Sequence, residues 1–439
     1  MAVSFCFIRD SVEVTMPAVT GLLFDLFIIL LAAKIAAELI ERVGQPAVIG
    51  ELLAGVIIGP YALGFIGTPS PSLIAGFHGD HALAQEAVNL VYHLFAELGV
   101  VVLLFFVGLE TRIADILRVG LRAVFVAVLG VALPFVLGYT LMGPILGQPQ
   151  IEAIFVGAAM VATSVGITAR VLRDLGVIAS TESRIILGAA VIDDILAMVI
   201  LAVVSGLATT GSVRPLDVLL IGGQAAAFTA FVALVGTGAM RRFALGFNRF
   251  RMEGAPLAIG LLTMLGLATL SASIGLAAII GAFLAGMVFA EAREHFELEH
   301  QTLPIYQFLV PFFFVLTGSQ VDWRLFVDPA IMGVALTVTA LAIIGKVVGC
   351  GLASSGLGRR SMAIIGVGMA PRGEVGLIVA SLGLSIGAIP PTIFGVVVVM
   401  SVLTTVVVPP VLRILYIGQP ETAISAEDRE SQAGLLPEM

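Results

Sequence analysis

Charged residues are scarce in this chain. Asp, Glu, Lys and Arg make up 12% of its 439 residues and hydrophobic residues 59%, and the mean hydropathy is +1.11. In soluble globular proteins about a quarter of the residues are charged. Apolar stretches of roughly 20 residues recur along the sequence, and each is long enough to cross the hydrocarbon core of a bilayer as a helix. The composition excludes a soluble globular protein and predicts an all-α polytopic membrane protein.

Cysteine and lysine are also rare. The two cysteines, Cys6 and Cys350, form no disulfide or metal-binding pattern and require no oxidising compartment. Lysine occurs only at Lys34 and Lys346. Residues 1–17 carry charges and only a short apolar piece, so we expect an N-terminal extension rather than a cleaved signal peptide. Nothing in the composition indicates a nucleic-acid partner or a bound cofactor.

Turn residues divide the apolar part of the chain, 18–416, into thirteen predicted transmembrane helices. The connections are short and rich in Gly, Pro, Ser or charged residues. Two boundaries split longer apolar stretches, at Ser271–Ser273 and at Gly387–Pro391. A short cytoplasmic tail, 417–439, is expected to follow. The predicted spans are 18–41, 46–65, 86–108, 120–142, 152–174, 182–208, 216–240, 254–270, 273–291, 303–319, 329–353, 360–383 and 390–415.

The arginines predict an orientation. With thirteen spans, sixteen of the 22 Lys and Arg residues fall in loops and ends on one side. The opposite side holds three, namely Arg9, Arg214 and Arg324. Positive residues favour the cytoplasmic side of short loops. We therefore expect a multi-pass protein of the plasma (inner) membrane, with the N-terminus outside and the C-terminus in the cytoplasm.

An odd number of spans allows an inverted repeat. Six spans, a linking helix at about 216–240 and six more spans place the two halves in opposite directions, as in many secondary transporters. The fifth span contains Gly157, Gly166 and a polar Thr163–Ser164 pair at mid-depth, and the twelfth contains Gly and Pro around Arg372 and Glu374. These positions predict two interrupted helices that cross near the midplane. Their free backbone groups would help to form an ion site.

Two consecutive aspartates lie in the middle of the sixth predicted span. Asp193 and Asp194 are about eleven residues into the helix, too deep to be N-terminal caps. Acidic residues at such a depth are costly and indicate a functional site. Neighbours on a helix point about 100° apart, so the two cannot share one ligand symmetrically. A buried carboxylate can hold either a proton or a hard cation, which prefers oxygen ligands. The alternative interpretation is a structural pair satisfied by hydrogen bonds between helices.

Lys346 is the counterpart of these acids. It lies thirteen residues before Arg359 and eighteen after Asp328, so both membrane faces are more than about 12 Å away. A side chain cannot readily reach water over that distance. We therefore expect Lys346 to pair with one of the two aspartates. The alternative interpretation is that Lys346 forms an ion pair with a structural role only.

At these residues the chain resembles the cation/proton antiporter superfamily. It is most similar to bacterial sodium/proton antiporters of the branch that includes the glutathione-gated potassium efflux proteins. The resemblance covers nearly all of 17–416. It is carried by QPAVIGELLAG at 45–55, ATSVGIT at 162–168, AVIDD at 190–194 and PRGEVGL at 371–377.

This resemblance implies a core domain from about 120–208 and 329–415 and a dimerisation domain from about 18–108 and 254–319. It implies a homodimer in which the core moves as an elevator. Asp194 would be the main ion-binding carboxylate and thus the Na⁺ ligand.

The resemblance also assigns the neighbouring residues. Asp193 would pair with Lys346, Thr163 and Ser164 would be the polar pair of the first crossing helix, and Glu374 the acid of the second. Arg372 would either support the break or line the pathway. An aspartate at 193 resembles the electrogenic branch, which exchanges two protons for one sodium ion.

Several alternatives differ in substrate or class. A K⁺/H⁺ or broad monovalent-cation antiporter uses the same ligand types. The potassium-efflux relatives carry a nucleotide-binding domain after the membrane region, for which 418–439 leaves no room, so we expect sodium exchange. An organic-anion/sodium symporter is disfavoured by the two acids and Lys346. An intramembrane aspartyl protease needs acids on facing helices, and a channel filter needs a repeated carbonyl loop or an oligomeric ring. The sequence therefore predicts a transporter rather than an enzyme.

Overall fold

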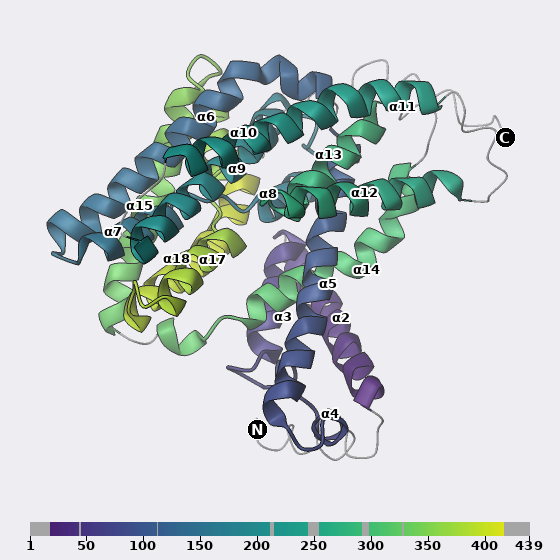
Figure 1. The fold of residues 1–439 in the computed structure, drawn as a ribbon, viewed down its shortest axis with the longest axis vertical. Coiled ribbons are helices and arrows are strands. Elements are labelled where there is room, and N and C mark those ends of the chain that lie inside the picture. The colour runs from purple at the N-terminus through teal and green to yellow at the C-terminus, as the bar shows by residue number, and fades with distance from the viewer. Residues whose placement is uncertain are drawn as a thin grey trace.

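The computed structural model describes residues 18–43, 45–111, 113–210, 215–244, 254–291, 298–326 and 329–416, and all regular elements in these ranges are helices (Figure 1). The predicted extension 1–17 and tail 417–439 lie outside the described residues. In the first half of the chain the helices are α2 Ala18–Arg42, α3 Ala47–Ile58, α4 Pro71–Gly76, α5 His81–Leu109, α6 Ile113–Thr140, α7 Gln150–Ala159, α8 Val165–Asp174, α9 Thr181–Thr210 and α10 Pro215–Phe231. In the second half they are α11 Thr237–Ala244, α12 Ala255–Ser273, α13 Ala278–Ala290, α14 Leu298–Ser319, α15 Pro329–Ala353, α16 Arg359–Gly368, α17 Glu374–Ser385 and α18 Pro391–Tyr416.

Each predicted span overlaps one or two of these helices. Within the described residues, seven helical stretches are long and apolar enough by themselves to cross a membrane. They are His81–Leu109, Gly120–Ile145, Gly222–Met240, Ala255–Ser273, Leu298–Ser319, Ile331–Ala353 and Pro391–Tyr416. The structure confirms an all-helical polytopic chain. The count of thirteen crossings and the inverted repeat stay predictions.

Two predicted boundaries are wrong. The second span was expected to run to residue 65, but α3 ends at Ile58. The break expected at Ser271–Ser273 lies later, between α12 and α13. Ser273 Oγ donates to the Leu270 carbonyl at 2.8 Å, so this serine bonds back to its own helix instead of ending it. Gly275 makes the turn with φ +84°, a conformation that glycine adopts at little cost.

The first helix group consists of α2, α3, α5, α12, α13 and α14, which pack against one another both as consecutive helices and as sequence-distant pairs. Close helix approach explains part of this packing. A Cβ at Gly55 of α3 would lie 2.0 Å from the Val315 carbonyl of α14, and one at Gly318 would lie 2.1 Å from the Leu52 carbonyl. Small residues at such crossings allow the backbones of membrane helices to touch.

The second helix group consists of α6, α7, α9 and α15 to α18. We count α8 with it because Thr168 and Ser164 bond to the backbone around the second break, although α8 also contacts α3 and α5 of the first group. Figure 1 shows most of it at the upper left of the view, whereas α2, α3 and α5 extend towards the bottom. The stretch from α10 through a π-helical segment, Val232–Gly236, to α11 packs on α9 of the second group and on α13 of the first. It therefore links the two groups.

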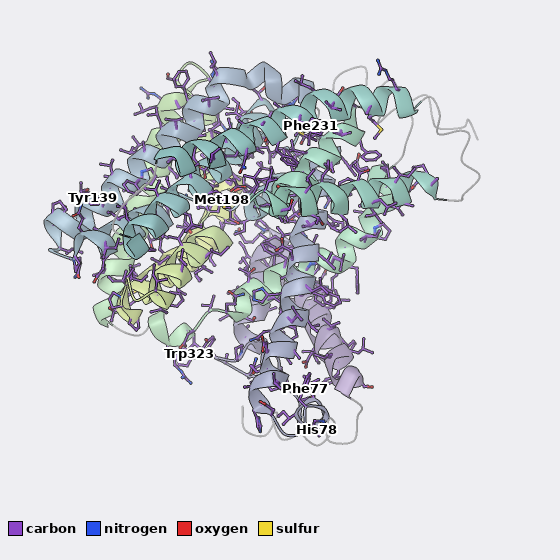
Figure 2. The ribbon with its side chains drawn as sticks, viewed as in Figure 1. Phe77, His78, Tyr139, Met198, Phe231 and Trp323 are labelled. Carbon is purple, nitrogen blue, oxygen red and sulfur yellow. The ribbon has the colours of Figure 1, made fainter. Side chains whose placement is uncertain are left out.

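The outer surface is apolar, as a lipid-facing surface should be. Figure 2 labels Phe231, whose side chain is 58% exposed at the end of α10. On α2 a row at helical spacing is exposed in the same way, with Leu23, Phe27 and Leu31 each at least 44% exposed. Asp193, Lys346 and Arg372 are instead fully buried inside the protein.

Two spans are interrupted, as the sequence predicted. Residues 160–164 separate α7 from α8, and residues 369–373 separate α16 from α17. The four half-helices have 10 to 12 residues each, about 15–18 Å, which is roughly half the thickness of the hydrocarbon core. Their inner ends therefore lie well inside the protein, with backbone groups that need partners.

Candidate ion-binding site

The two helix breaks cross in direct contact. The Ser164 backbone N–H donates to the Pro371 carbonyl at 2.9 Å, and Thr163 Oγ1 donates to the Met369 carbonyl at 3.0 Å. A Cβ at Gly373 would lie 2.6 Å from Ser164 Oγ, so only glycine fits at the crossing. Each break thus provides hydrogen-bond partners for some of the free backbone groups of the other. Non-helical backbone at membrane depth requires such partners.

Asp193 lies beside this crossing and is fully buried. Its Oδ1 accepts a hydrogen bond from Lys346 Nζ at 2.8 Å, and its Oδ2 accepts one from the Thr163 backbone N–H at 3.0 Å. Thr163 precedes the N-terminus of α8, where free N–H groups and the helix dipole favour a negative charge. One carboxylate therefore joins α9, α15 and the first break.

Lys346 has no exposed surface, and α6 makes room for it. A Cβ at Gly130 of α6 would lie 3.4 Å from Lys346 Nζ and 2.6 Å from Cys350 Sγ. Any larger residue at position 130 would displace these two side chains. The structure contains the expected ion pair between Lys346 and the first aspartate.

Asp194 is also buried, with 5% of its surface exposed. It follows Asp193 on α9 and therefore points in a different direction by about 100°. Thr163 and Ser164 are 2% and 1% exposed. The structure therefore places both aspartates, Lys346 and the polar pair at one level of the second helix group. Glu374 begins α17 directly after the second break, but its side chain lies outside the described part of the chain.

Arg372 lies in the second break, and its side chain stabilises the first break. The side chain is fully buried, and its Nη1 donates to the carbonyls of Val161 at 3.0 Å and Ala162 at 2.7 Å. These carbonyls directly follow the C-terminal end of α7, where a positive charge is favourable. Of the two interpretations that the sequence left open, this geometry favours support of the break.

The sequence reasoning missed the polar residues that hold the second break in place. Thr404 Oγ1 accepts from the Arg372 backbone N–H at 3.0 Å, and Thr405 Oγ1 donates to the Arg372 carbonyl at 2.9 Å. On α8, Thr168 Oγ1 donates to the Gly368 carbonyl at 2.7 Å. A signal was present, because Thr404 and Thr405 interrupt a long apolar stretch at mid-depth.

We expect Arg372→Gln to lower the free energy of unfolding by about 2–4 kcal/mol, because two buried carbonyls lose a charged donor. Arg324→Gln is the matched control, since Arg324 is exposed in the connection before α15. The measurement is the melting temperature of both variants in the same detergent. Equal melting temperatures would show that Arg372 does not support the break.

No group of three or more His, Cys, Asp and Glu side chains that could hold a metal ion occurs among the described residues. Carboxylate, hydroxyl and backbone carbonyl oxygens are the ligands that hard cations prefer. All three types are present around the crossing.

Comparison with known proteins identifies the family of the chain. The family model described as "Sodium/hydrogen exchanger, transmembrane" matches residues 27–417. The high-affinity Na⁺/H⁺ antiporter NhaS3 of Synechocystis sp. is 36% identical over 431 residues, which cover 94% of this chain and 93% of that protein. The Na⁺/H⁺-K⁺ antiporter GerN of Bacillus cereus is 34% identical over 406 residues, covering 92% and 98% of the two chains.

A solved structure supports the fold. The sodium/proton antiporter MjNhaP1 of Methanocaldococcus jannaschii aligns with a TM-score of 0.61 at 18% identity, covering 90% of this chain and 96% of that one. At this identity the match shows a shared fold only. The family match over residues 27–417 and the two relatives above show that the chain belongs to the sodium/hydrogen exchanger family of membrane cation/proton antiporters.

Proposed function

We propose that this protein exchanges Na⁺ for H⁺ across the membrane. The observation that carries the proposal is the arrangement at the helix crossing, where Asp193 bridges Lys346 and the Thr163 N–H while Asp194 is buried beside it. The names of NhaS3 and GerN, which both include Na⁺/H⁺ antiport, support the choice of ions.

Asp194 is the proposed carrier of the cation and of a proton. A buried carboxylate without a bound cation is stabilised by protonation, so the two ligands compete for one group. Thr163 and Ser164, and the carbonyls of the crossing, would supply further oxygens to the cation. Because Asp193 already accepts two hydrogen bonds, it is less available as a direct ligand.

Exchange is proposed to be electrogenic, with two protons for one Na⁺. Lys346 and Asp193 supply a second titratable pair that is desolvated on both sides. If cation binding releases one proton from Asp194 and one from Lys346, two protons are exchanged for one Na⁺. Each cycle then moves one net charge across the membrane. The pair would re-form when the cation leaves.

The proposed mechanism is an elevator. The residues of the site lie on α7 to α9 and on α15 to α18, hence all in the second helix group. This group can carry the site as one body while the first group stays fixed as a dimerisation domain. The protein is proposed to be a homodimer in the plasma membrane, with the N-terminus outside and the C-terminus in the cytoplasm.

The second candidate is K⁺/H⁺ or broad monovalent-cation exchange. The name of GerN includes K⁺ beside Na⁺, which favours testing both ions. The types of ligand at the site do not distinguish Na⁺ from K⁺, because both cations prefer oxygen ligands.

The test is transport by purified protein in liposomes, with current and internal pH recorded after separate jumps of Na⁺, Li⁺ and K⁺. We expect proton movement with net current after the Na⁺ jump. Exchange with K⁺ would support the second candidate, and exchange without current would contradict the proposed stoichiometry. No proton movement with any of the three ions would contradict both candidates.

A further inference from the structure

A second group of buried charges lies between the two helix groups, away from the crossing. One face of α8 turns towards the first helix group and carries Gly166, Arg170 and Arg173, spaced four and three residues apart. Residues at this spacing lie on one side of a helix. The proposed transport cycle does not by itself assign a role to the two arginines.

Both arginines pair with acids of the first helix group. Arg170 Nη2 lies 3.5 Å from Glu51 Oε1 of α3, and Arg173 Nε lies 3.6 Å from Glu110 Oε1, directly after α5. The Glu51 side chain is 1% exposed and that of Arg170 12%. Such buried charges are costly unless they are paired, so each pair fixes α8 against the first group.

Aromatic rings complete the contact. The guanidinium of Arg173 lies 4.3 Å from the ring centres of both Phe106 of α5 and Tyr306 of α14, and that of Arg170 lies 5.4 Å from the Tyr306 ring. Cations over aromatic faces are attracted most strongly where water is excluded. Three helices of the first group therefore receive the two arginines.

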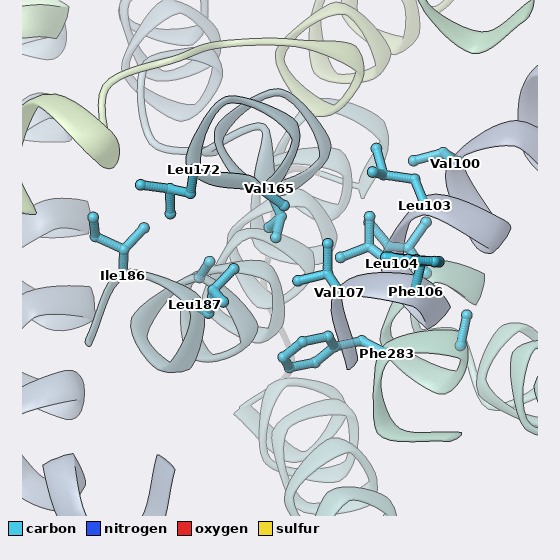
Figure 3. Close-up of a cluster of buried hydrophobic side chains, with 14 of the residues drawn as sticks. Val100, Leu103, Leu104, Phe106, Val107, Val165, Leu172, Ile186, Leu187 and Phe283 are labelled. Atoms are coloured by element: carbon cyan, nitrogen blue, oxygen red, sulfur yellow. The ribbon is translucent and has the colours of Figure 1, made fainter. Parts of the chain in front are cut away.

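Apolar side chains form a seal next to the ion pairs. A Cβ at Gly166 would lie 3.4 Å from Val100, 3.5 Å from Leu103 and 3.5 Å from Phe313. Figure 3 shows the apolar cluster that runs from Ile186 and Leu187 of α9 past Val165 of α8 to Val107 and Leu103 of α5. These apolar side chains are buried at this level of the interface.

The pairs across the interface differ from those within the second group. Their distances of 3.5 and 3.6 Å exceed those of good hydrogen bonds, whereas Lys346 and Asp193 are 2.8 Å apart. Arg170 also has a partner on its own helix, since its Nε lies 3.0 Å from both carboxylate oxygens of Asp174. If α8 leaves the first group, Asp174 moves with it and keeps Arg170 paired.

The opposite side of α8 belongs to the ion site. Thr168 donates to the Gly368 carbonyl, and the Ser164 N–H donates to the Pro371 carbonyl. A movement of the site against the first group therefore takes α8 with it and breaks the contacts of Arg170 and Arg173 with that group.

We propose that Arg170 and Arg173, with Glu51 and Glu110, form an ionic gate that closes one end of the pathway and opens in each transport cycle. This inference rests on the proposed alternating access. In the Na⁺/H⁺ cycle the four residues neither bind the cation nor carry its proton. They set how readily the two helix groups separate at this end.

The test is reagent access to a cysteine placed in the seal. Leu103→Cys is made in a full-length background with Cys6→Ser and Cys350→Ser, and its reaction with a small methanethiosulfonate is timed in detergent. Adding Glu51→Gln and Arg170→Gln removes both charges of the pair across the interface. Asp174, the other partner of Arg170, keeps its charge but is 19% exposed. We expect labelling to become about tenfold faster, the effect of losing a contact to a charged group.

The matched control is Glu38→Gln with Arg42→Gln, an exposed pair at 2.8 Å within α2 that does not join the groups. It should leave the labelling rate unchanged. The single variants Glu51→Gln and Arg170→Gln should each give nearly the rate of the double variant, because both remove the same contact. A melting temperature measured alongside identifies general unfolding, which would expose the reporter without opening a gate.

Equal labelling of the parent and the double variant, or acceleration that only follows unfolding, would overturn the gate. The result does not depend on which ion is transported. Faster labelling without any cation-driven proton movement in liposomes would leave the gate standing and contradict the proposed exchange. Normal exchange with unchanged labelling would support the proposed exchange and contradict the gate.

Discussion

Asp194→Asn is expected to reduce cation-driven proton movement to the leak rate of protein-free liposomes. Asparagine has nearly the same shape as aspartate, but it binds no exchangeable proton and gives no charge to a desolvated cation. A cation at this buried position would then lack the negative partner that makes its desolvation affordable. The measurement is internal pH after a Na⁺ jump, for the parent and the variant at equal protein density.

The variant should remain folded. Removing a buried charge by a substitution of equal volume leaves no cavity, so we expect a melting temperature close to that of the parent. Glu86→Gln is a matched control, because Glu86 is an exposed acid on α5 and should transport normally. Exchange at the parent rate in a folded Asp194→Asn protein would remove Asp194 from the mechanism.

Lys346→Gln and Asp193→Asn are expected to differ from Asp194→Asn in their effect. They should change protein stability and the charge moved in each cycle more than cation binding. Each leaves one buried ion without its partner, since both side chains are fully buried and 2.8 Å apart. Breaking such a pair costs about 3–5 kcal/mol. The melting temperature should fall clearly in both variants.

The double variant distinguishes a lost pair from a lost fold. With Asp193→Asn and Lys346→Gln together, no uncompensated charge is buried, so the protein should be more stable than either single variant. If Asp194 alone carries the cation, exchange continues in the double variant with a smaller current for each Na⁺ moved. Parent current and parent melting temperature in both single variants would refute the proposed role of the pair.

The sequence was sufficient to predict the buried charges and the helix breaks of the candidate site. Asp193, Asp194 and Lys346 were identified because charges are rare in apolar stretches, so each one at mid-depth needs a reason. The helix breaks were predicted from Gly157, Gly166 and the Gly and Pro residues around Arg372. The structure places both breaks within a few residues of those positions.

Boundaries and partners were predicted less well. The turn between α12 and α13 was placed at the serines, although serine can bond to its own helix and Gly275 makes the turn. The short helix α4 was not expected. Thr404 and Thr405 were overlooked, because a hydroxyl in a membrane helix usually bonds to its own backbone and gives no sign of a distant partner.

The sequence by itself determined that the chain is a helical membrane protein and which charged residues lie deep within apolar stretches. These properties follow from local composition and length, which the chain carries along each helix. Only the tertiary structure decided that Lys346 bonds to Asp193, that Arg372 supports the break after α7, and that Arg170 and Arg173 reach Glu51 and Glu110. Such pairs join residues 63 to 211 positions apart, and the packing of helices, including the close approach allowed by glycines, sets which of the few buried charges meet.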